Sequence, residues 1–131
     1  MIFEDEKWLA FLDHRPLFPG HVLLIPKNHI ETLAQLPASD NGSFLATIQL
    51  LSVAVEAAMK AQGTFIAINN KVSQSVPHLH VHVVPRRRGD GLRGFFWPRG
   101  RYESLEEMRG IQGRLHQEVL RQLGQEIHRK A

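Results

Sequence analysis

The chain alternates between short apolar runs bounded by turn residues and two longer segments of helical period. Three of the runs, residues 8–12, 21–25 and 64–68, are rich in large apolar residues and have the composition of β-strands. The first two are separated by a turn that contains Pro19 and Gly20. Because so short a link joins them, they predict an antiparallel pair.

The first helical segment begins after Pro37, with Ser39 or Asp40 as its N-cap residue. Apolar residues then recur three or four positions apart, which is the period of a helix with one buried face. These positions are Leu45, Ile48, Leu51, Val55 and Met59. Gly63 lies where a C-terminal glycine would end the helix. We expect this apolar face to pack in the core.

A second helix is predicted after residue 104, where Ser104 and Glu107 have the spacing of a capping box. Its apolar face would carry Met108, Ile111, Leu115 and Val119, whereas Gly110 and Gly113 weaken it. We expect the tail after Gly124 to fray. Together the pattern predicts an α+β fold with a small antiparallel sheet, one long helix across it and a second, C-terminal helix.

One further run, residues 78–84, carries histidine at alternate positions: His78, His80 and His82. Successive side chains of a strand point to opposite faces, so the three imidazoles would share one face while the apolar residues between them pack on the other. Pro85 then closes the predicted strand. A strand that needs only to be buried has no use for three titratable rings, so this face predicts a functional site.

Three kinds of chemistry suit such a face. The first is metal binding, with His21 as a possible fourth ligand, although no carboxylate or cysteine of the expected kind lies nearby. The second is a set of structural histidines, which is plausible for one ring but not for three. The third is covalent catalysis, in which a neutral imidazole attacks phosphorus while a neighbouring ring and the polar loop 73–75 supply donors. The residues fit phosphate chemistry better than a metal.

Composition narrows the class of protein. The 131 residues, 43% of them hydrophobic and 22% charged, are typical of one soluble domain, and the absence of cysteine excludes disulfides and thiolate sites. We expect no apolar run long enough to span a membrane, and the first six residues do not resemble a signal peptide, so we expect a cytoplasmic protein. Six arginines follow the histidines and form either a solvated loop or a positive field that attracts a phosphorylated substrate: Arg86, Arg87, Arg88, Arg93, Arg99 and Arg101. Nucleic acid is a weaker candidate for this basic segment.

The histidine run resembles the signature of the histidine triad (HIT) superfamily, in which three histidines alternate with apolar residues. Several flanking motifs extend the resemblance over residues 3–86, and they are Asp13-His14-Arg15-Pro16, Pro19-Gly20-His21, Ile25-Pro26-Lys27, Gln74-Ser75-Val76-Pro77 and Pro85-Arg86. The last of these resembles the dinucleoside polyphosphate hydrolase, or fragile-histidine-triad-type, branch. The resemblance implies a single HIT domain over 1–131, with its core at 3–86, an extension at 87–131 and a sheet of about five strands.

The resemblance also implies roles for the histidines. His80 matches the nucleophile that takes a nucleoside monophosphate from the α-phosphorus, with its second nitrogen donating to a main-chain carbonyl of its own strand. His82 would contact the phosphate and the leaving group, and His78 would support the site. His21 matches a supporting histidine behind the triad.

Substrate-binding roles follow in the same way. Gln74 and Ser75 match positions that hydrogen-bond the phosphate or the leaving group. Asp13 matches the residue that binds the ribose hydroxyls, although a turn aspartate is the alternative. Phe11 and Leu23 match the base pocket but also fit a plain core, and Asn69 or Asn70 would close the site near the ribose or the phosphate. The loop after them is about one residue shorter than in many relatives, and Ser73 replaces a glycine.

The implied function is a nucleotide hydrolase or nucleotidyl transferase that cleaves a dinucleoside polyphosphate, such as diadenosine tri- or tetraphosphate, through a nucleotidyl-His80 intermediate. The alternatives are a purine nucleoside phosphoramidase, a nucleotide phosphorylase and a nucleotide-binding protein of low turnover. We expect no cofactor required by the protein, although a divalent cation can accompany the substrate phosphates. We also expect a homodimer and no membrane or nucleic-acid partner; a C-terminal segment that reaches the partner's site would bring Trp97 or Arg99 near the substrate.

Overall fold

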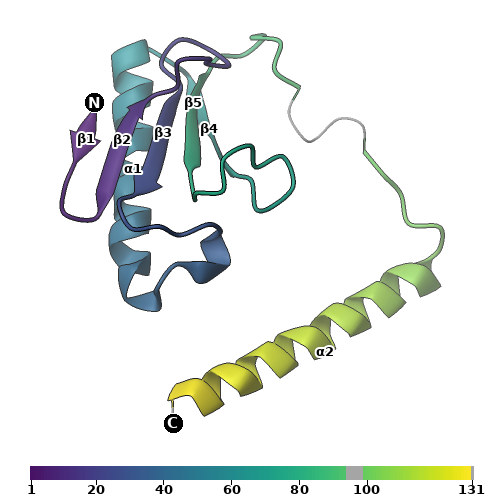
Figure 1. Ribbon diagram of the computed structural model, residues 1–131. Coiled ribbons are helices and arrows are strands. Elements are labelled where there is room, and N and C mark those ends of the chain that lie inside the picture. The colour runs from purple at the N-terminus through teal and green to yellow at the C-terminus, as the bar shows by residue number, and fades with distance from the viewer. Residues whose placement is uncertain (94–98, 131) are drawn as a thin grey trace. The chain divides into compact units, whose positions relative to one another are not determined.

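The computed structural model describes residues 1–93 and 99–130, so Trp97 lies outside the described residues. In chain order the elements are β1 (Phe3–Glu4), β2 (Trp8–Leu12), β3 (Val22–Pro26), η1 (Leu33–Gln35), η2 (Ala38–Asp40), α1 (Asn41–Met59), β4 (Gly63–Ile68), β5 (Val81–Arg86) and α2 (Leu105–Lys130) (Figure 1). Two compact units divide the chain: Met1–Gly91 holds the sheet and α1, and the unit that begins at Leu92 holds α2.

The five strands form one antiparallel sheet in the order β1-β2-β3-β5-β4, as the α+β prediction required. Phe11 pairs with Leu23, and Leu23 pairs with His82 on the next strand. Directly paired residues of neighbouring strands point to the same face. Two apolar side chains and one histidine therefore form a row across one face of the sheet.

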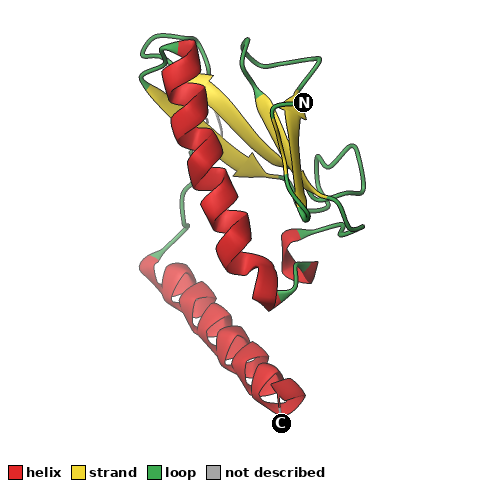
Figure 2. Ribbon diagram, turned by 90° about the vertical axis from the view of Figure 1, so that its left-hand side faces the viewer, coloured by secondary structure: helices red, strands yellow, loops and turns green. Residues whose placement is uncertain are grey.

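The opposite face of the sheet packs against α1, which runs along it (Figure 2). Alternate residues of β2, β3 and β5 are buried there, as the two-residue period of strands requires. The core on this side consists of Trp8, Ala10, Val22, Leu24, Val81 and Val83 from the sheet with Phe44, Ile48, Leu51 and Val55 from α1. One face of the sheet is thus committed to the core and leaves the other for the cleft described below.

The core face of α1 differs from its prediction at both ends. Leu45 is 57% exposed, and Phe44 is buried in its place with its ring centroid 5.3 Å from that of Trp8. Either Phe44 or Leu45 fits the period of a helix with one buried face. The position of Trp8 on the sheet decides that Phe44 is the buried one. The helix ends at Met59, with Lys60 in the left-handed region at a φ of 50°, and Gly63 instead begins β4.

The stretch Ala38–Met59 has the length and mean hydropathy, 1.5, of a membrane span, contrary to the expectation that no apolar run is long enough. In the fold its buried residues Ile48 and Leu51 pack against the sheet. Asp40 lies at its N-cap position as predicted, but no side-chain hydrogen bond caps the helix there. The Asp40 carboxylate pairs instead with the ammonium group of Lys7. The stretch is therefore the core helix of this fold.

The histidine strand begins later and ends later than predicted. β5 covers Val81–Arg86, so His78 and His80 lie in the loop segment that leads into it, and Pro85 is part of the strand. Pro85 pairs with Thr64 of β4 without closing the strand. The three histidines are therefore held by two kinds of backbone, a loop for His78 and His80 and a sheet for His82.

In the second unit, the hydroxyl of Ser104 accepts a hydrogen bond from the main-chain N–H of Glu107 at 3.0 Å, as the capping-box spacing predicts. The carboxylate of Glu107 accepts from the main-chain N–H of Glu103. The predicted fraying after Gly124 is wrong, since α2 continues as a regular helix to Lys130.

Candidate functional site

A cleft of about 600 Å³ opens on the sheet face opposite α1. It is lined by Phe11, Asp13, His14, Arg15, Leu23, Ile25, Ser75, Val76, His78, His80 and His82. Seven of these eleven residues were predicted from the sequence as site residues, whereas His14, Arg15, Ile25 and Val76 were not. The cleft combines an apolar floor on β2 and β3 with three imidazoles on one side.

His80 is oriented by a hydrogen bond to its own segment. Its Nδ1 lies 2.7 Å from the main-chain carbonyl oxygen of His78. A carbonyl only accepts, so Nδ1 carries the proton, and the neutral ring must hold its lone pair on Nε2. An unprotonated ring nitrogen in a cleft is the form of histidine that acts as a nucleophile.

His78 is tied to the sheet by the same kind of contact. Its Nε2 lies 2.8 Å from the main-chain carbonyl oxygen of Pro26, at the end of β3. The ring also packs against His29, with centroids 5.5 Å apart. His78 thus anchors the loop that carries His80 to the neighbouring strand, which suits a supporting role.

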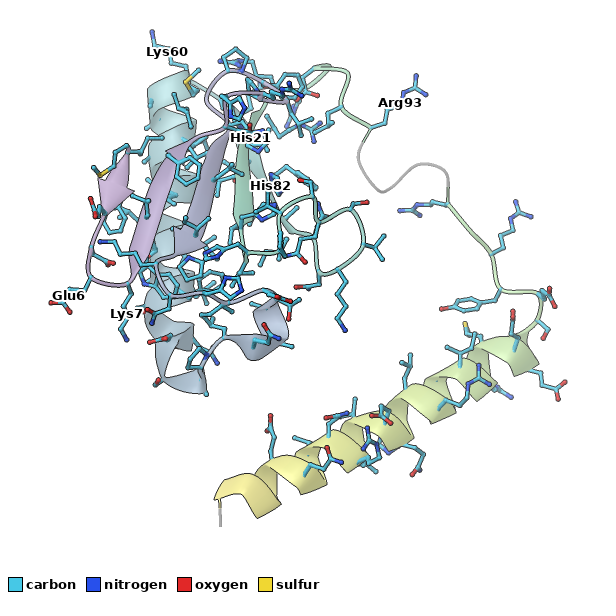
Figure 3. The ribbon with its side chains drawn as sticks, in the orientation of Figure 1. Glu6, Lys7, His21, Lys60, His82 and Arg93 are labelled. Atoms are coloured by element: carbon cyan, nitrogen blue, oxygen red, sulfur yellow. The ribbon has the colours of Figure 1, made fainter. Side chains whose placement is uncertain are left out.

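His82 pairs with His21, and Figure 3 labels both rings beside the strands. His82 Nδ1 lies 2.9 Å from His21 Nε2, and the main-chain N–H of Leu17 donates to His21 Nδ1 at 3.1 Å. His21 is only 3% exposed and does not line the cleft, so it lies behind His82. His82 is in turn beside His80, with ring centroids 5.0 Å apart.

Both members of this pair are neutral at pH 7. Burial lowers the pKa of His21 below its ordinary value of 6.5, and the nearby Asp13 carboxylate opposes the shift only in part. Burial also lowers the pKa of His82, and positive charge on His21 or His80 would lower it further, against the same opposing effect of Asp13. The His21–His82 pair therefore supplies N–H donors without a fixed positive charge.

Asp13 has two roles in the local structure. Its Oδ1 accepts a hydrogen bond from the main-chain N–H of Arg15 at 2.9 Å, and its Oδ2 lies 3.8 Å from His21 Nε2. The first contact is the turn role that the sequence left open as an alternative. Because Asp13 also lines the cleft, its second oxygen is available to a ligand there.

Asp13, His21 and His82 bring three potential metal-binding atoms within 4.8 Å of one another. To bind a metal through Nε2, His21 would need a lone pair on that nitrogen. The N–H of Leu17 already requires the lone pair on Nδ1, and a neutral imidazole has only one. Nε2 therefore carries a proton, and this arrangement does not fit a metal ion.

The other predicted polar residues lie differently from their expected contacts. Gln74 does not line the cleft: its amide donates to the main-chain carbonyl of Glu31, and its oxygen accepts from the N–H of Lys71. The side-chain oxygen of Asn70 accepts from the N–H of Leu33. Asn69 is half-buried just after β4 and is not among the lining residues. Gln74 and Asn70 thus fasten the loop to residues 31–33, and the cleft receives Ser75 from it.

The loop also has a strained backbone at two residues. Lys71 and Ser73 have φ values of 69° and 60°, in the left-handed region that favours glycine. The resemblance to the histidine triad superfamily implies glycine at position 73 in many members, and the positive φ of Ser73 fits such a preference. Contacts from Asn70 and Gln74 on both sides hold the conformation.

Comparison with known proteins gives one family. The HIT domain model matches residues 1–89. A HIT-like protein of Mycobacterium tuberculosis (strain CDC 1551 / Oshkosh) whose function is uncharacterised is 41% identical over 93 residues, which cover 70% of this chain and 65% of that protein. The adenylylsulfatase HINT3 of Arabidopsis thaliana is 34% identical over a match that covers 70% of this chain and 47% of that protein. The asymmetrical bis(5'-nucleosyl)-tetraphosphatase of Schizosaccharomyces pombe is 34% identical over a match that covers 62% of this chain and 46% of that protein. The chain thus spans less than two thirds of the length of these relatives.

Solved structures agree with this likeness. A protein of Streptococcus mutans UA159 has 31% sequence identity and a TM-score of 0.74, covering 93% of this chain and 75% of that one. A Zn-bound histidine triad family protein of Mycobacterium smegmatis has 38% identity and a TM-score of 0.65, covering 95% and 85%. The sheet and helix arrangement around the cleft is therefore one that related sequences adopt.

Proposed function

Because the chain belongs to the HIT domain family, we propose that it is a nucleotide hydrolase or nucleotidyl transferase that cleaves a dinucleoside polyphosphate at the α-phosphate. The observation that carries the proposal is the hydrogen bond from His80 Nδ1 to the carbonyl of His78. It fixes the lone pair of a cleft-lining imidazole on Nε2, which is what attack on phosphorus needs. The tetraphosphatase activity named for the Schizosaccharomyces pombe relative supports the choice of substrate class.

In the proposed reaction, His80 Nε2 attacks the α-phosphorus, and the bond from phosphorus to the bridging oxygen breaks. The bonding electrons leave on that oxygen with the remaining nucleotide, and His82 contacts the leaving oxygen. Water then attacks the phosphorus of the nucleotidyl-His80 intermediate, the phosphorus–nitrogen bond breaks, and a proton passes to solvent. His80 returns to its neutral form and a nucleoside monophosphate is released.

The remaining cleft residues suit the rest of a nucleotide. Phe11, Leu23 and Ile25 offer an apolar surface to the flat base, and Asp13 has a carboxylate oxygen for the ribose hydroxyls. The hydroxyl of Ser75 can donate to a phosphate oxygen. Gln74 can reach the phosphate only by releasing its contacts with Glu31 and Lys71, so its predicted role implies a movement of this loop.

We propose no metal or cofactor required by the protein. The Asp13–His21–His82 group does not fit a metal for the reason given above, and a divalent cation would arrive with the substrate phosphates. We further propose a cytoplasmic homodimer that has no nucleic-acid partner. The position of β4 at the end of the strand order and the exposed residues Leu50 and Val53 of α1 support the homodimer.

The alternative within the family is a purine nucleoside phosphoramidase, whose leaving group is an amine. The two are separated by one assay of diadenosine tetraphosphate and adenosine 5'-phosphoramidate in parallel, with and without chelator, with the released nucleotides resolved by chromatography. We expect cleavage of the polyphosphate that survives chelation. Preference for the phosphoramidate would select the alternative, and turnover of neither would leave a nucleotide-binding protein.

The nucleophile is tested by His80→Ala. We expect turnover to fall by a factor of at least about 100, while nucleotide binding by calorimetry stays measurable because the base and ribose contacts remain. His116→Ala, which changes an exposed histidine of α2, is the matched control and should keep turnover. A His80→Ala variant that retains more than a few per cent of wild-type activity would exclude the covalent mechanism.

A further inference from the structure

The main-chain N–H of Leu17 contacts the site indirectly, through His21. This N–H donates to His21 Nδ1, and His21 Nε2 contacts His82 Nδ1. We propose that the Leu17 N–H is a positioning group that fixes the protons of both rings, so that His82 offers an N–H donor at Nε2 to polyphosphate leaving groups. The proton order stands on geometry alone, and its consequence for the leaving group rests on the proposed function.

The positions of the protons on His21 and His82 follow from the main-chain N–H of Leu17. An amide N–H only donates, so His21 Nδ1 must accept, and the proton of the neutral ring lies on Nε2. That N–H donates to His82 Nδ1 at 2.9 Å, so Nδ1 of His82 must accept in turn. The proton of a neutral His82 therefore lies on Nε2, the one ring nitrogen that His21 does not contact.

The same contacts oppose a positive charge on either ring. A doubly protonated His21 would place an N–H at Nδ1 against the N–H of Leu17, and a doubly protonated His82 would place one against His21. Two donors cannot hydrogen-bond each other at these distances. The burial of His21, which is 3% exposed, acts in the same direction because it disfavours a charged ring.

A neutral His82 has a limited chemical capacity. It can donate a hydrogen bond from Nε2 to an oxygen on which charge develops, but full loss of that proton would leave an anionic ring. A polyphosphate leaves as a stable anion and needs only the hydrogen bond, whereas an amine must gain a proton to leave. The proton order therefore favours leaving groups joined through a phosphate oxygen over leaving groups joined through nitrogen.

Histidine tautomers can be read directly, without substrate, from long-range ¹H–¹⁵N spectra of the full chain. We expect proton-bearing Nε2 in His21 and His82 and proton-bearing Nδ1 in His80. A His82 ring with its proton on Nδ1 would overturn the proposed order even if polyphosphate turnover is fast. The expected order in a protein that cleaves no dinucleotide would support it and overturn only the proposed function.

The role of Leu17 is tested by replacing leucine 17 with its α-hydroxy acid counterpart, which exchanges the N–H for an oxygen and keeps the side chain. We expect a mixture of His82 tautomers and a kcat lower by roughly tenfold or more, with little change in KM. The same ester at residue 18 is the control, since the N–H of Phe18 makes no hydrogen bond within the described part of the chain. Equal spectra and rates for the two esters would overturn the proposal.

A second pair of variants uses ordinary amino acids. In His21→Gln, the side-chain amide can take the place of Nε2–H and donate to His82, whereas His21→Ala removes the donor. We expect the glutamine variant to keep the His82 tautomer and a kcat that is flat from pH 7 to 9, and the alanine variant to lose both. A wild-type kcat that falls over this range as His82 loses a proton would show that His82 is a proton source and would overturn the proposal.

Discussion

At the scale of single residues, the cleft is defined by which nitrogen of each ring is protonated. Main-chain groups decide this at three part-buried contacts: the carbonyl of Pro26 for His78, the carbonyl of His78 for His80 and the N–H of Leu17 for His21. Backbone groups keep their donor or acceptor character, so each fixes one tautomer of the neutral ring that it contacts. The chemistry of the site is thus set by the fold around the histidines as much as by the histidines.

The lowered pKa values of the buried His21 and the half-buried His82 predict acid destabilisation. Both His21 and His82 have folded-state pKa values below the ordinary 6.5, so between these values the unfolded chain binds more protons. Their contribution to stability is fully present above pH 6.5 and is lost as the pH falls through the folded-state pKa values. We expect the urea midpoint, followed by tryptophan fluorescence, to fall between pH 7 and pH 5.

His21→Gln should weaken this pH dependence, because one of the two rings with a lowered pKa is replaced by a side chain that does not titrate. His116→Gln, at an exposed position of α2, is the matched control and should leave the dependence unchanged. A midpoint that is constant or rises on acidification would contradict the assignment of both rings as neutral with lowered pKa values.

The sequence could predict the histidines but not all of their surroundings. The alternation of polar and apolar residues placed His82 on the face of the sheet that carries the site. The same two-residue period places Ile25 on the face of Leu23, so it could have predicted that Ile25 lines the cleft. By contrast, no periodic signal places His14 or Arg15 in the cleft, because turn residues have no fixed face. Such positions depend on how the chain packs beyond the turn.

At the scale of elements, the turn between β2 and β3 carries both Leu17 and His21, so its geometry matters for the site. Gly20, one residue before His21, has a φ of +95°, which side chains other than glycine rarely adopt. An added Cβ there would lie 2.6 Å from Met59 Cγ, at the end of α1. The end of the core helix therefore supports the turn that holds the proton order.

Gly20→Ala should accordingly lower the free energy of unfolding by about 2–5 kcal/mol, from backbone strain plus overpacking. In a Met59→Ala background the steric part disappears, and the loss should shrink to about 1–2 kcal/mol. Gly42→Ala is the control, since nothing lies within 4 Å of its added Cβ and alanine favours the helix. Equal losses in both backgrounds, measured by urea unfolding, would contradict the contact with Met59.

Element types were predictable from the sequence because period and turn residues carry them, whereas several boundaries depend on tertiary contacts. The strand predicted over 78–84 begins only at Val81, since His78 and His80 use their backbone and rings for loop contacts. Gln74 was predicted in the site from family resemblance, but its amide satisfies main-chain groups of Lys71 and Glu31. Sequence gives the candidates for a polar contact, and packing decides among them.

At the scale of the whole molecule, exposed apolar side chains gather at one border of the first unit, where α1 adjoins the last strand of the sheet. β4 has six residues and stands at the end of the strand order, next to β5. The Ser52 hydroxyl of α1 lies 3.0 Å from the Thr64 hydroxyl of β4, so the helix and this strand adjoin. Leu50 and Val53 are 52% and 69% exposed on α1, and Ile66 is 42% exposed on β4. Exposed apolar side chains at the border of a sheet favour contact with another chain.

The proposed homodimer should therefore form by antiparallel pairing of two β4 edges about a two-fold axis, with α1 packing against its copy. Ile66→Lys places a charge at this edge, where two-fold symmetry brings both copies close, and we expect a monomer in sedimentation velocity. Ile2→Lys is the matched control, because Ile2 is 46% exposed next to β1 at the opposite edge of the sheet. It should remain a dimer. A wild-type monomer at micromolar concentration, or the same mass for both variants, would contradict this interface. A catalytically active monomer would show that the cleft is complete within one chain.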